Sequence, residues 1–372
     1  MRVLFCSTPF WPSIGGRQIF GLELVLSLKE RGYAFVVMTS HDDLSLRDKT
    51  QYKGIPIHRF PLRTVLMDRD LNQLMVTRRE VIDLKRTFGP DLVHIHGFDP
   101  AITLFQIETA AVYRVPLLLT LTEDPPGFNN ELFNRTLLSA DWVTSKSAEG
   151  LTQARQLVPE ITPRSSVIHN GLDIPSVLPT PLPFETPRLL CLGRLAVQKG
   201  FDVALTALAS IIDRFPRVRL IMAGDGPERA KLEQQIADLG LTDKVELVGW
   251  VAPDEVPTLI NTATVVLMPS RWEGLPSVAL QTAMMARPIV ATQVGGLPEV
   301  VVHQETGLLV NPDDSAGLAE AIAFLLEHPQ AAAQMGEAAR SRVKEVFSWE
   351  RCVDQYDALY RQLIMQKSAS YA

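Results

Sequence analysis

The sequence has few cysteines and no long apolar run. Its three cysteines, in 372 residues, are scattered and offer neither a disulfide framework nor the paired spacing of a zinc site. No apolar stretch approaches the roughly 18 residues that suggest a membrane-spanning helix. The opening residues, MRVLFCSTPFW, also lack the basic, apolar and small-residue order of a signal peptide. We therefore expect a cytoplasmic protein.

The sequence also lacks an excess of positive charge. Lysines and arginines number 36 against 42 aspartates and glutamates, which gives a formal net charge of −6. Residues 1–173 contain 19 of each sign, which leaves 17 basic and 23 acidic side chains for the remainder of the chain. A general nucleic-acid-binding surface is not expected. Any anionic ligand must be held by local groups, such as helix N-termini and single arginines or lysines.

Short apolar runs alternate with amphipathic stretches along the whole chain. The runs are continuously apolar, which is typical of buried parallel strands, and 372 residues exceed what one hydrophobic core usually holds. The fold class that follows is α/β, with two Rossmann-like doubly wound domains. We predict strands at residues 3–7, 35–39, 92–95, 117–121, 142–144 and 167–168, and again at 189–192, 220–223, 245–248, 265–268, 289–291 and 308–310.

A proline-rich stretch separates the two predicted domains. Residues 174–187, IPSVLPTPLPFETP, contain five prolines in fourteen residues and no periodicity, as a semi-rigid linker would. The domains are then residues 1–173 and 188–348. Open parallel sheets bind ligands beyond the carboxyl ends of their strands, so two such domains can face each other across a cleft. We therefore examined the residues that follow each strand.

Residues 270–302, SRWEGLPSVALQTAMMARPIVATQVGGLPEVVV, are the stretch around which we expect the function to be organised. A turn over Gly274, Leu275 and Pro276 leads from an apolar strand into a predicted helix. Helix N-termini expose unpaired N–H groups and the positive end of the peptide dipoles, so this turn can hold a diphosphate. Glu273 can accept hydrogen bonds from sugar hydroxyls beside it, and Gln281, about one helical turn inside, can address the same ligand.

Two cations follow the strand predicted at residues 189–192. Gly193 and Arg194 lie at its end, and Lys199 comes just before the next predicted helix. The fork of an arginine and the compact charge of a lysine together suit a diphosphate leaving group. Trp250 follows the strand predicted at residues 245–248, where it could stack on a base.

The first domain offers weaker signals. Gly15 and Gly16 precede a predicted helix, where they allow close approach to a phosphate or sugar or simply form a tight loop; they are not a GxGxxG fingerprint.

Polar side chains also follow two strands of the first domain. In HIHG, the histidines at 94 and 96 share one face of a strand; we interpret His94 as structural and place His96 on the acceptor side. Without further clustered ligands we predict no metal site. Thr122 and Glu123 follow the strand predicted at residues 117–121, where they could orient an acceptor hydroxyl or belong to a solvated loop.

Residues 61–90 could form an amphipathic helix on a membrane surface, because basic side chains alternate with leucine, isoleucine and methionine. A helix packed on the core with a charged outer face explains the pattern better. Peripheral association with the inner face of a membrane stays open.

Several motifs, in the right order over essentially the whole chain, resemble those of the retaining glycosyltransferases of family 4. They are GGR near the start, HIH, HNGLD at 169–173, GRLAVQKG, AGDGP, LVGWV, PSRWEGLPSVALQTAMMARPIVATQVGGLPEVV and the closing FSWERCVDQYDALY. The resemblance implies the GT-B fold, with residues 349–372 forming a helix that crosses back to the first domain.

The resemblance also implies a reaction. Such enzymes transfer a sugar from a UDP-, GDP- or ADP-sugar to a saccharide, lipid-linked or small-molecule acceptor, with retention and without a metal or other cofactor. Carried over, Arg194 and Lys199 would neutralise the departing diphosphate, Glu273 would hold donor-sugar hydroxyls, and the leaving phosphate would help take the acceptor proton. Gly15 and Gly16 would close over the donor.

Two positions depart from the family pattern. Gln281 stands where a glutamate usually binds ribose hydroxyls, and Thr122 stands where a histidine usually lies near the sugar. These departures motivate the alternative of a catalytically weak subunit that binds a nucleotide sugar or a partner. A sugar-nucleotide epimerase of similar fold is a third hypothesis.

Overall fold

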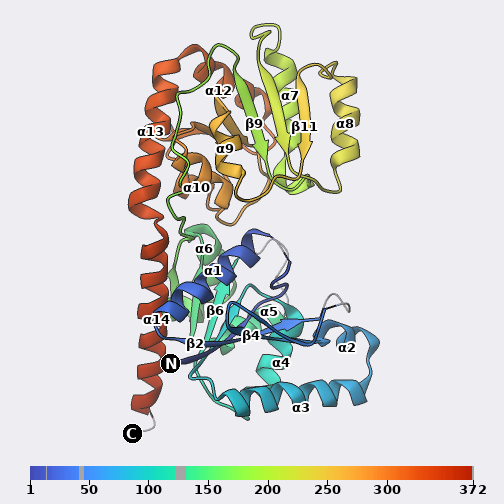
Figure 1. The fold of residues 1–372 in the computed structure, drawn as a ribbon, viewed down its shortest axis with the longest axis vertical. Coiled ribbons are helices and arrows are strands. Elements are labelled where there is room, and N and C mark those ends of the chain that lie inside the picture. The colour runs from blue at the N-terminus through green and yellow to red at the C-terminus, as the bar shows by residue number, and fades with distance from the viewer. Residues whose placement is uncertain (14, 42–45, 123–130, 371–372) are drawn as a thin grey trace. The chain divides into compact units, whose positions relative to one another are not determined.

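The computed structural model describes residues 1–13, 15–41, 46–122 and 131–370, and it divides the chain into two compact units (Figure 1). Unit 1 consists of Met1–His169 together with Cys352–Ala372, and unit 2 is Asn170–Arg351. The chain therefore leaves unit 1 once and returns to it at its C-terminal end. Segment 174–187, predicted as a linker, falls within unit 2.

The described part of unit 1 contains an eight-stranded sheet whose strands are parallel, except that its first two pair antiparallel. In spatial order they are β3 (Lys49–Tyr52), β4 (Ile55–Phe60), β2 (Ala34–Ser40), β1 (Arg2–Cys6), β5 (Leu92–His96), β6 (Leu117–Leu121), β7 (Trp142–Ser145) and β8 (Ser165–Val167).

The hairpin of β3 and β4 was absent from the sequence-based prediction. Its two-residue turn is Lys53 and Gly54, both with positive φ, at 46° and 76°, as a tight hairpin turn requires. In β4 the buried Ile55 and Ile57 alternate with the exposed Pro56. This short alternation and the glycine at the turn were the signals that could have revealed the hairpin.

The helices of unit 1 cover both faces of its sheet. They are α1 (Gly16–Glu30), α2 (Leu62–Asp68), α3 (Leu71–Phe88), α4 (Pro100–Ala110), α5 (Glu131–Ser139), α6 (Ala148–Leu157), the 3-10 turn η1 (Pro159–Arg164) and the part of α14 (Trp349–Ser370) from Cys352 onward. α14 buries Tyr356 and Tyr360 completely, and the Tyr360 hydroxyl lies 2.6 Å from His94 Nδ1. His94 is thus part of the interior of unit 1.

Unit 2 contains a six-stranded parallel sheet in the described residues. In spatial order its strands are β11 (Val245–Gly249), β10 (Arg219–Ala223), β9 (Arg188–Leu192), β12 (Val265–Met268), β13 (Ile289–Thr292) and β14 (Gly307–Val310). Counted along the chain this is the order 3-2-1-4-5-6 of a doubly wound sheet. All six predicted strands are present, and the predicted α/β fold class is confirmed.

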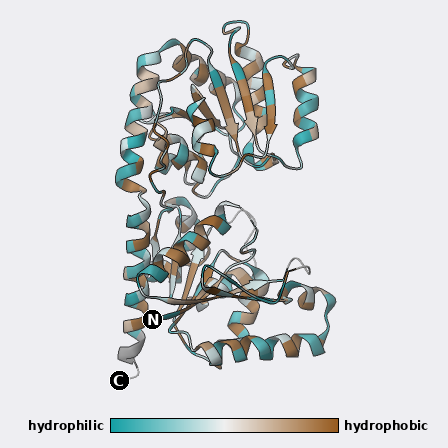
Figure 2. Cartoon of the chain, viewed as in Figure 1, coloured by the Kyte–Doolittle hydropathy of each residue, from teal (hydrophilic) through white to brown (hydrophobic). Residues whose placement is uncertain are grey.

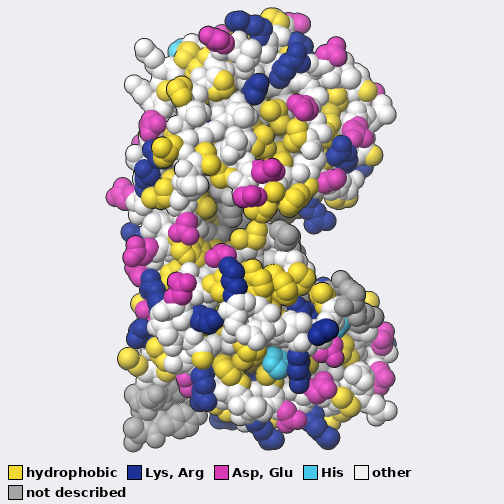
Figure 3. All heavy atoms as spheres, in the orientation of Figure 1, with side chains coloured by type: hydrophobic (Ala, Val, Ile, Leu, Met, Phe, Trp, Pro, Cys, Tyr) yellow, Lys and Arg dark blue, Asp and Glu magenta, His cyan; other side chains and the backbone are white. Residues whose placement is uncertain are grey.

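Alternate residues of the unit 2 strands face two different hydrophobic clusters. Leu189 and Cys191 pack on α7 (Phe201–Ile211), α8 (Arg229–Asp238) and α12 (Ser315–Glu327), whereas Leu190 packs with α9 (Val256–Asn261), α10 (Ser277–Met284), α11 (Leu297–Val300) and α13 (Pro329–Val346). Figure 2 shows hydrophobic residues gathered along the strands, with hydrophilic residues on the outer sides of the helices. On the visible face of each unit, basic and acidic side chains are interspersed (Figure 3).

The proline-rich segment 174–187 is tied to unit 2 by a buried arginine. Arg287, 1% exposed, donates to the carbonyl and hydroxyl oxygens of Thr180 at 2.7 and 2.8 Å and to the carbonyl of Asn261. Burial lowers the pKa of this guanidinium to about 10. No helix among the described residues has both the length and the apolar composition needed to cross a membrane.

Candidate active site

The carboxyl ends of three unit 2 strands are packed backbone against backbone. Gly200, with φ of +62°, follows η2 (Val197–Lys199); a Cβ on it would lie 2.0 Å from the Pro269 carbonyl oxygen. A Cβ on Gly224 would lie 1.8 Å from the Gly193 carbonyl oxygen. Only glycine permits these approaches. They hold η2, the loop after β10 and the β12–α10 loop together.

Lys199 and Glu273 meet beyond the carboxyl ends of these strands. Lys199 Nζ lies 2.5 Å from Glu273 Oε1, and their side chains are 20% and 5% exposed. The Ser270 hydroxyl donates to the same carboxylate oxygen at 2.7 Å, and Thr292 in turn donates to the Ser270 carbonyl. Glu273 Oε2 has no hydrogen bond among the described residues, so one carboxylate oxygen is available to a ligand.

Arg194 does not join this pair. The side chain is exposed, just beyond the end of β9, and it makes no hydrogen bond or ion pair within the described parts of the chain. The structure thus brings Lys199 and Glu273 together and leaves Arg194 as a solvated cation on the same edge.

The N-terminus of α10 follows Glu273 directly. Pro276 is the residue before the helix and supplies no side-chain cap; Leu275 is buried, and the Gly274 carbonyl accepts from Gly296 N at 2.6 Å. The first N–H groups of a helix lack intrahelical partners and carry its positive dipole end. A negatively charged group could therefore be bound here.

Gln281 lies one turn into α10, on the same side as the first helical residue, Ser277. Both residues are half-buried. The Gln281 side chain makes no hydrogen bond with the described residues, so its amide is free to meet a ligand.

Sequence reasoning missed Asn170 and Arg271. Asn170, 4% exposed, directs its Nδ2 at the Leu275 carbonyl, 3.5 Å away, and its Oδ1 has no partner in the described structure. The HNGLD motif was its only signal. Arg271, in the RWEG run, binds Asp202 and Asp313; no spacing rule links these three residues.

Trp250 is 63% exposed after edge strand β11. β11 lies three positions from β12 in the sheet, which is about 14 Å at the usual strand spacing. Trp250 therefore does not contact Glu273 directly. Both could contact one extended ligand.

In unit 1, Gly15 and Gly16 begin α1. Gly15 is the extended residue before the helix, with φ of −180°, and its carbonyl accepts from Ile19 N at 2.9 Å. No side chain caps this helix N-terminus. The glycine pair thus leaves a second helix end open to a ligand.

His96, which we placed on the acceptor side, is completely buried and has no exposed surface for an acceptor to contact. The ring stacks between Phe5 and Phe20, at centroid distances of 5.6 and 5.4 Å, and neither ring nitrogen has a partner among the described residues. Burial, followed by the charge of Lys146, lowers the pKa of His96 well below its ordinary value. The imidazole is therefore neutral.

Thr122 is 9% exposed, and its side chain packs against the backbone of Gly97. A Cβ built on that glycine would be 2.9 Å from Thr122 Oγ1. Glu123 lies outside the described residues. No group of three or more His, Cys, Asp or Glu side chains in the described chain is placed to hold a metal ion.

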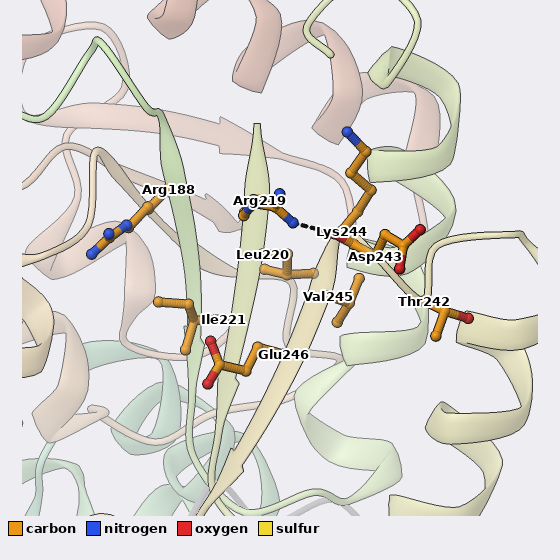
Figure 4. A pocket seen from close by; sticks show the side chains of 9 residues that line it. All are labelled: Arg188, Arg219, Leu220, Ile221, Thr242, Asp243, Lys244, Val245 and Glu246. Atoms are coloured by element: carbon orange, nitrogen blue, oxygen red, sulfur yellow. Dashed lines mark hydrogen bonds between the residues drawn. The ribbon is translucent and has the colours of Figure 1, made fainter. Parts of the chain in front are cut away.

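A separate pocket of about 380 Å³ lies at the amino ends of the unit 2 strands (Figure 4). Arg188, Arg219 and Val245, the first residues of β9, β10 and β11, line it. Because these are the amino ends of the strands, the pocket is distinct from the Lys199–Glu273 site.

Comparison with known proteins matches both halves of the chain to glycosyltransferase families. A family of glycosyl transferases, group 1, matches residues 179–342, and glycosyltransferase family 4 matches residues 14–175. A glycogen synthase of Mycobacterium tuberculosis is 30% identical over 293 residues, which cover 73% of this chain and 69% of that protein.

Two solved structures share the fold. Sucrose-phosphate synthase from Thermosynechococcus elongatus superimposes with a TM-score of 0.84 at 22% identity, covering 98% of this chain and 99% of that one. The Anabaena HepE protein in complex with UDP-glucose superimposes with a TM-score of 0.78 at 22% identity, covering 100% of both chains. The chain therefore belongs to the group 1 glycosyl transferases of family 4 and is a glycosyltransferase of the GT-B fold.

Proposed function

We propose that this protein moves a sugar from a UDP-, GDP- or ADP-sugar to an acceptor hydroxyl, with retention at the anomeric carbon, in glycan, glycolipid or natural-product biosynthesis. The observation that carries the proposal is the Lys199–Glu273 contact of 2.5 Å beside the uncapped N-terminus of α10. A lysine, a carboxylate and a helix N-terminus at one sheet edge match the three chemical features of a sugar diphosphate: charge, hydroxyls and phosphate oxygens.

In the proposed reaction, the bond between the anomeric carbon and the diphosphate breaks while the acceptor oxygen bonds to the same face of that carbon. Lys199, Arg194 and the N–H groups of α10 stabilise the charge that develops on the diphosphate. The acceptor proton passes to an oxygen of the leaving phosphate, so neither a protein base nor a metal is needed. Glu273 Oε2 accepts a hydrogen bond from a hydroxyl of the donor sugar.

The remaining candidate residues take roles around this centre. Gln281 addresses the ribose hydroxyls, and Trp250 stacks on the base. The open N-terminus of α1, at Gly15 and Gly16, gives unit 1 an anion-binding helix end of its own. The nucleotide sugar is the co-substrate, and no other cofactor takes part.

Thermal stabilisation by a panel of UDP-, GDP-, ADP- and TDP-sugars tests the donor assignment. A ligand that binds the native state raises its stability with the logarithm of concentration over Kd. UDP-glucose comes first because HepE, which has this fold, is bound to it. A shift with one nucleotide series supports the proposal and names the donor. The absence of any shift at millimolar concentration contradicts it.

Product analysis separates the alternatives. A transferase releases free nucleotide in an acceptor-dependent manner, and an epimerase interconverts donors without an acceptor. The catalytically weak alternative, which the neutral amide of Gln281 favours, predicts donor binding without nucleotide release. Retention is read from the anomeric configuration of the product by nuclear magnetic resonance.

We also propose that unit 1 associates peripherally with an anionic membrane through the junction of α2 and α3. The inner face of α3 packs on unit 1 through Thr77 and Val81, so residues 61–90 do contain a core-packed helix. The junction nevertheless carries four exposed apolar side chains, beside exposed charges of both signs that include Asp68, Arg69, Asp70 and Arg79. They are Met67 (80% exposed), Leu71 (74%), Met75 (58%) and Val76 (49%). Apolar side chains exposed at a helix end can insert into a lipid surface, and Arg69 and Arg79 can contact its anionic headgroups.

Sedimentation with phosphatidylglycerol-containing vesicles tests this association. Leu71→Glu should abolish co-sedimentation, and Leu239→Glu, at an exposed leucine in unit 2, should not. Equal binding of both variants, or none by the wild type, contradicts the proposal.

A further inference from the structure

Two segments distant in sequence are joined beside the candidate active site. The first, residues 197–202, carries Lys199, and the second, residues 269–273, carries Glu273. Arg271 N donates to the Gln198 carbonyl at 2.8 Å, and the Gln198 side chain donates to the Trp272 carbonyl at 3.0 Å. The distance between Lys199 and Glu273 therefore depends on how firmly these two segments are held together.

The side chain of Arg271 provides the strongest of these connections. Its two terminal nitrogens bind both carboxylate oxygens of Asp202, at 3.0 and 2.7 Å, and Nε binds Asp313 Oδ1 at 2.8 Å. The same guanidinium donates to the Val197 carbonyl at 2.7 Å. One side chain thus binds η2, the first turn of α7 and the loop before α12. A bidentate arginine fixes orientation as well as distance.

Arg271 also controls the charge near the site. Burial would raise the pKa of Asp202, but the hydrogen bonds and charge of Arg271 lower it below its ordinary value, so this carboxylate is ionised. Without Arg271, two uncompensated carboxylates would flank the segment that carries Lys199. The carboxylates of Asp202 and Asp313 would compete with Glu273 for the ammonium group of Lys199, and they would repel a diphosphate.

We propose that Arg271 is a positioning residue for sugar transfer, which holds Lys199 and Glu273 in register by neutralising and clamping Asp202 and Asp313. This inference rests on the proposed function. Arg271 need not touch the donor, because its bonds are made to Asp202, Asp313 and the Val197 carbonyl. Its effect reaches the reaction through the geometry of the Lys199–Glu273 pair.

The test compares Arg271→Ala and Arg271→Lys in the full-length protein, using the nucleotide sugar that stabilises the wild type most in the panel above. Release of free nucleotide gives kcat and the donor KM. Because misplacing a group that acts on the transition state costs rate more than binding, Arg271→Ala should lower kcat by about 10-fold or more, with the donor KM changed by less than about 3-fold. Arg271→Lys should recover part of kcat, because it restores one charge without the fork.

A second variant separates positioning from simple structural support. Adding Asp202→Asn to Arg271→Ala removes the uncompensated charge without restoring the clamp, so kcat per folded molecule should rise above that of Arg271→Ala alone. Arg214→Ala is the matched control: Arg214 makes an ion pair with Glu327 on the surface of unit 2, beyond the C-terminal end of α7, and its loss should leave kcat unchanged.

Two results would overturn the inference. One is an Arg271→Ala protein whose kcat stays within about 2-fold of the wild type, less than the effect of a misplaced group. The other is an Arg271→Ala protein whose loss of activity equals its unfolded fraction. In that case neither the Arg271→Lys variant nor the added Asp202→Asn substitution would restore kcat. Failure of the proposed function is seen separately: Lys199→Ala and Glu273→Ala would then also retain activity, or no donor would bind the wild type.

Discussion

At the residue scale, Glu273 combines burial with an unused hydrogen-bonding oxygen. Its side chain is 5% exposed, and Oε1 already accepts from Lys199 and Ser270. A buried carboxylate with one unused oxygen is suited to a ligand hydroxyl, and contacts that strengthen in the transition state are the ones that catalyse. We therefore expect the proposed sugar transfer to depend strongly on this side chain.

Glu273→Ala should reduce sugar transfer by at least about 100-fold, in line with removal of one important transition-state contact. The measurement is kcat from release of free nucleotide. Glu246→Ala, in the pocket at the amino ends of the unit 2 strands, is the control and should be fully active. Near-normal activity of the Glu273 variant would refute the assigned site.

Gln281→Glu should remain active and change nucleotide preference. A carboxylate accepts hydrogen bonds from two ribose hydroxyls, whereas an amide also donates and carries no charge. Affinities for UDP, GDP and ADP, measured by titration calorimetry, should shift relative to one another by about 3-fold or more, equivalent to part of one hydrogen bond. If all three stay the same, Gln281 does not contact the ribose.

At the element scale, η2 and the β12–α10 loop touch through a glycine. Gly200→Ala would place a Cβ 2.0 Å from the Pro269 carbonyl oxygen. The backbone must then move, so we expect a loss of about 2 kcal/mol or more in unfolding free energy and a fall in kcat. Gly240→Ala is the matched control, because Gly240 has a similar φ of +66° but no atom within 4 Å of the new Cβ. Equal effects of the two substitutions would exclude the steric explanation.

α3 and α4 are joined by a buried lysine. Lys85, 1% exposed, donates to Gln106 Oε1 at 2.7 Å and Thr109 Oγ1 at 2.6 Å. Burial lowers its pKa from 10.5 to about 8. Between these two values the unfolded chain holds the proton more firmly than the native protein, so the contribution of Lys85 to stability rises with pH.

Urea denaturation from pH 7 to 10 measures this contribution against Lys85→Met. Wild-type stability should increase relative to the variant by up to about 1.4 kcal/mol per pH unit above pH 8. Burial raises the pKa of Cys6 to about 12 although the charge of Lys85 lowers it, so this thiol acts in the opposite direction and is replaced by alanine in both proteins. A difference independent of pH would show that Lys85 has the same pKa in the native and the unfolded protein.

At the scale of the whole molecule, the C-terminal helix completes the N-terminal unit. Tyr360 and Tyr356 of α14 lie with His94 and Thr120 in a buried polar network; the Tyr360 hydroxyl is 2.6 Å from His94 Nδ1, and His94 Nε2 is 2.8 Å from Thr120 Oγ1. Burial lowers the pKa of His94 to about 3. The network therefore joins neutral groups, and unit 1 is incomplete without the last residues of the chain.

Tyr360→Phe should destabilise the protein by about 1–3 kcal/mol, because it leaves a buried imidazole nitrogen without its partner. The thermal midpoint, measured by circular dichroism, reports the change. Tyr113→Phe, at a half-buried tyrosine with no hydrogen bond among the described residues, should leave the midpoint unchanged. A Tyr360→Phe protein as stable as the wild type would mean that water replaces the hydroxyl.

The strands and the main site residues followed from sequence because each depends on local pattern. Continuous apolar runs predicted β6 and β12 to the residue, since burial of a parallel strand on both faces leaves little choice of residue type. The RWEG turn before a helix marked Glu273. The β3–β4 hairpin was missed because its apolar alternation covers only a few residues, and the burial of His96 because sequence does not show what stacks on an imidazole.

The sequence by itself determined which residue types stand at the ends of the strands, and hence the kind of chemistry available to the protein. Only the tertiary structure decided that Lys199 and Glu273, 74 residues apart, lie 2.5 Å from each other, that Arg271 binds the segment next to Lys199, and that α14 completes unit 1. The reason is physical: local pattern reflects burial along one segment, whereas these contacts arise from strand order and from the close approach of backbones at Gly200 and Gly224, which no spacing along the chain encodes.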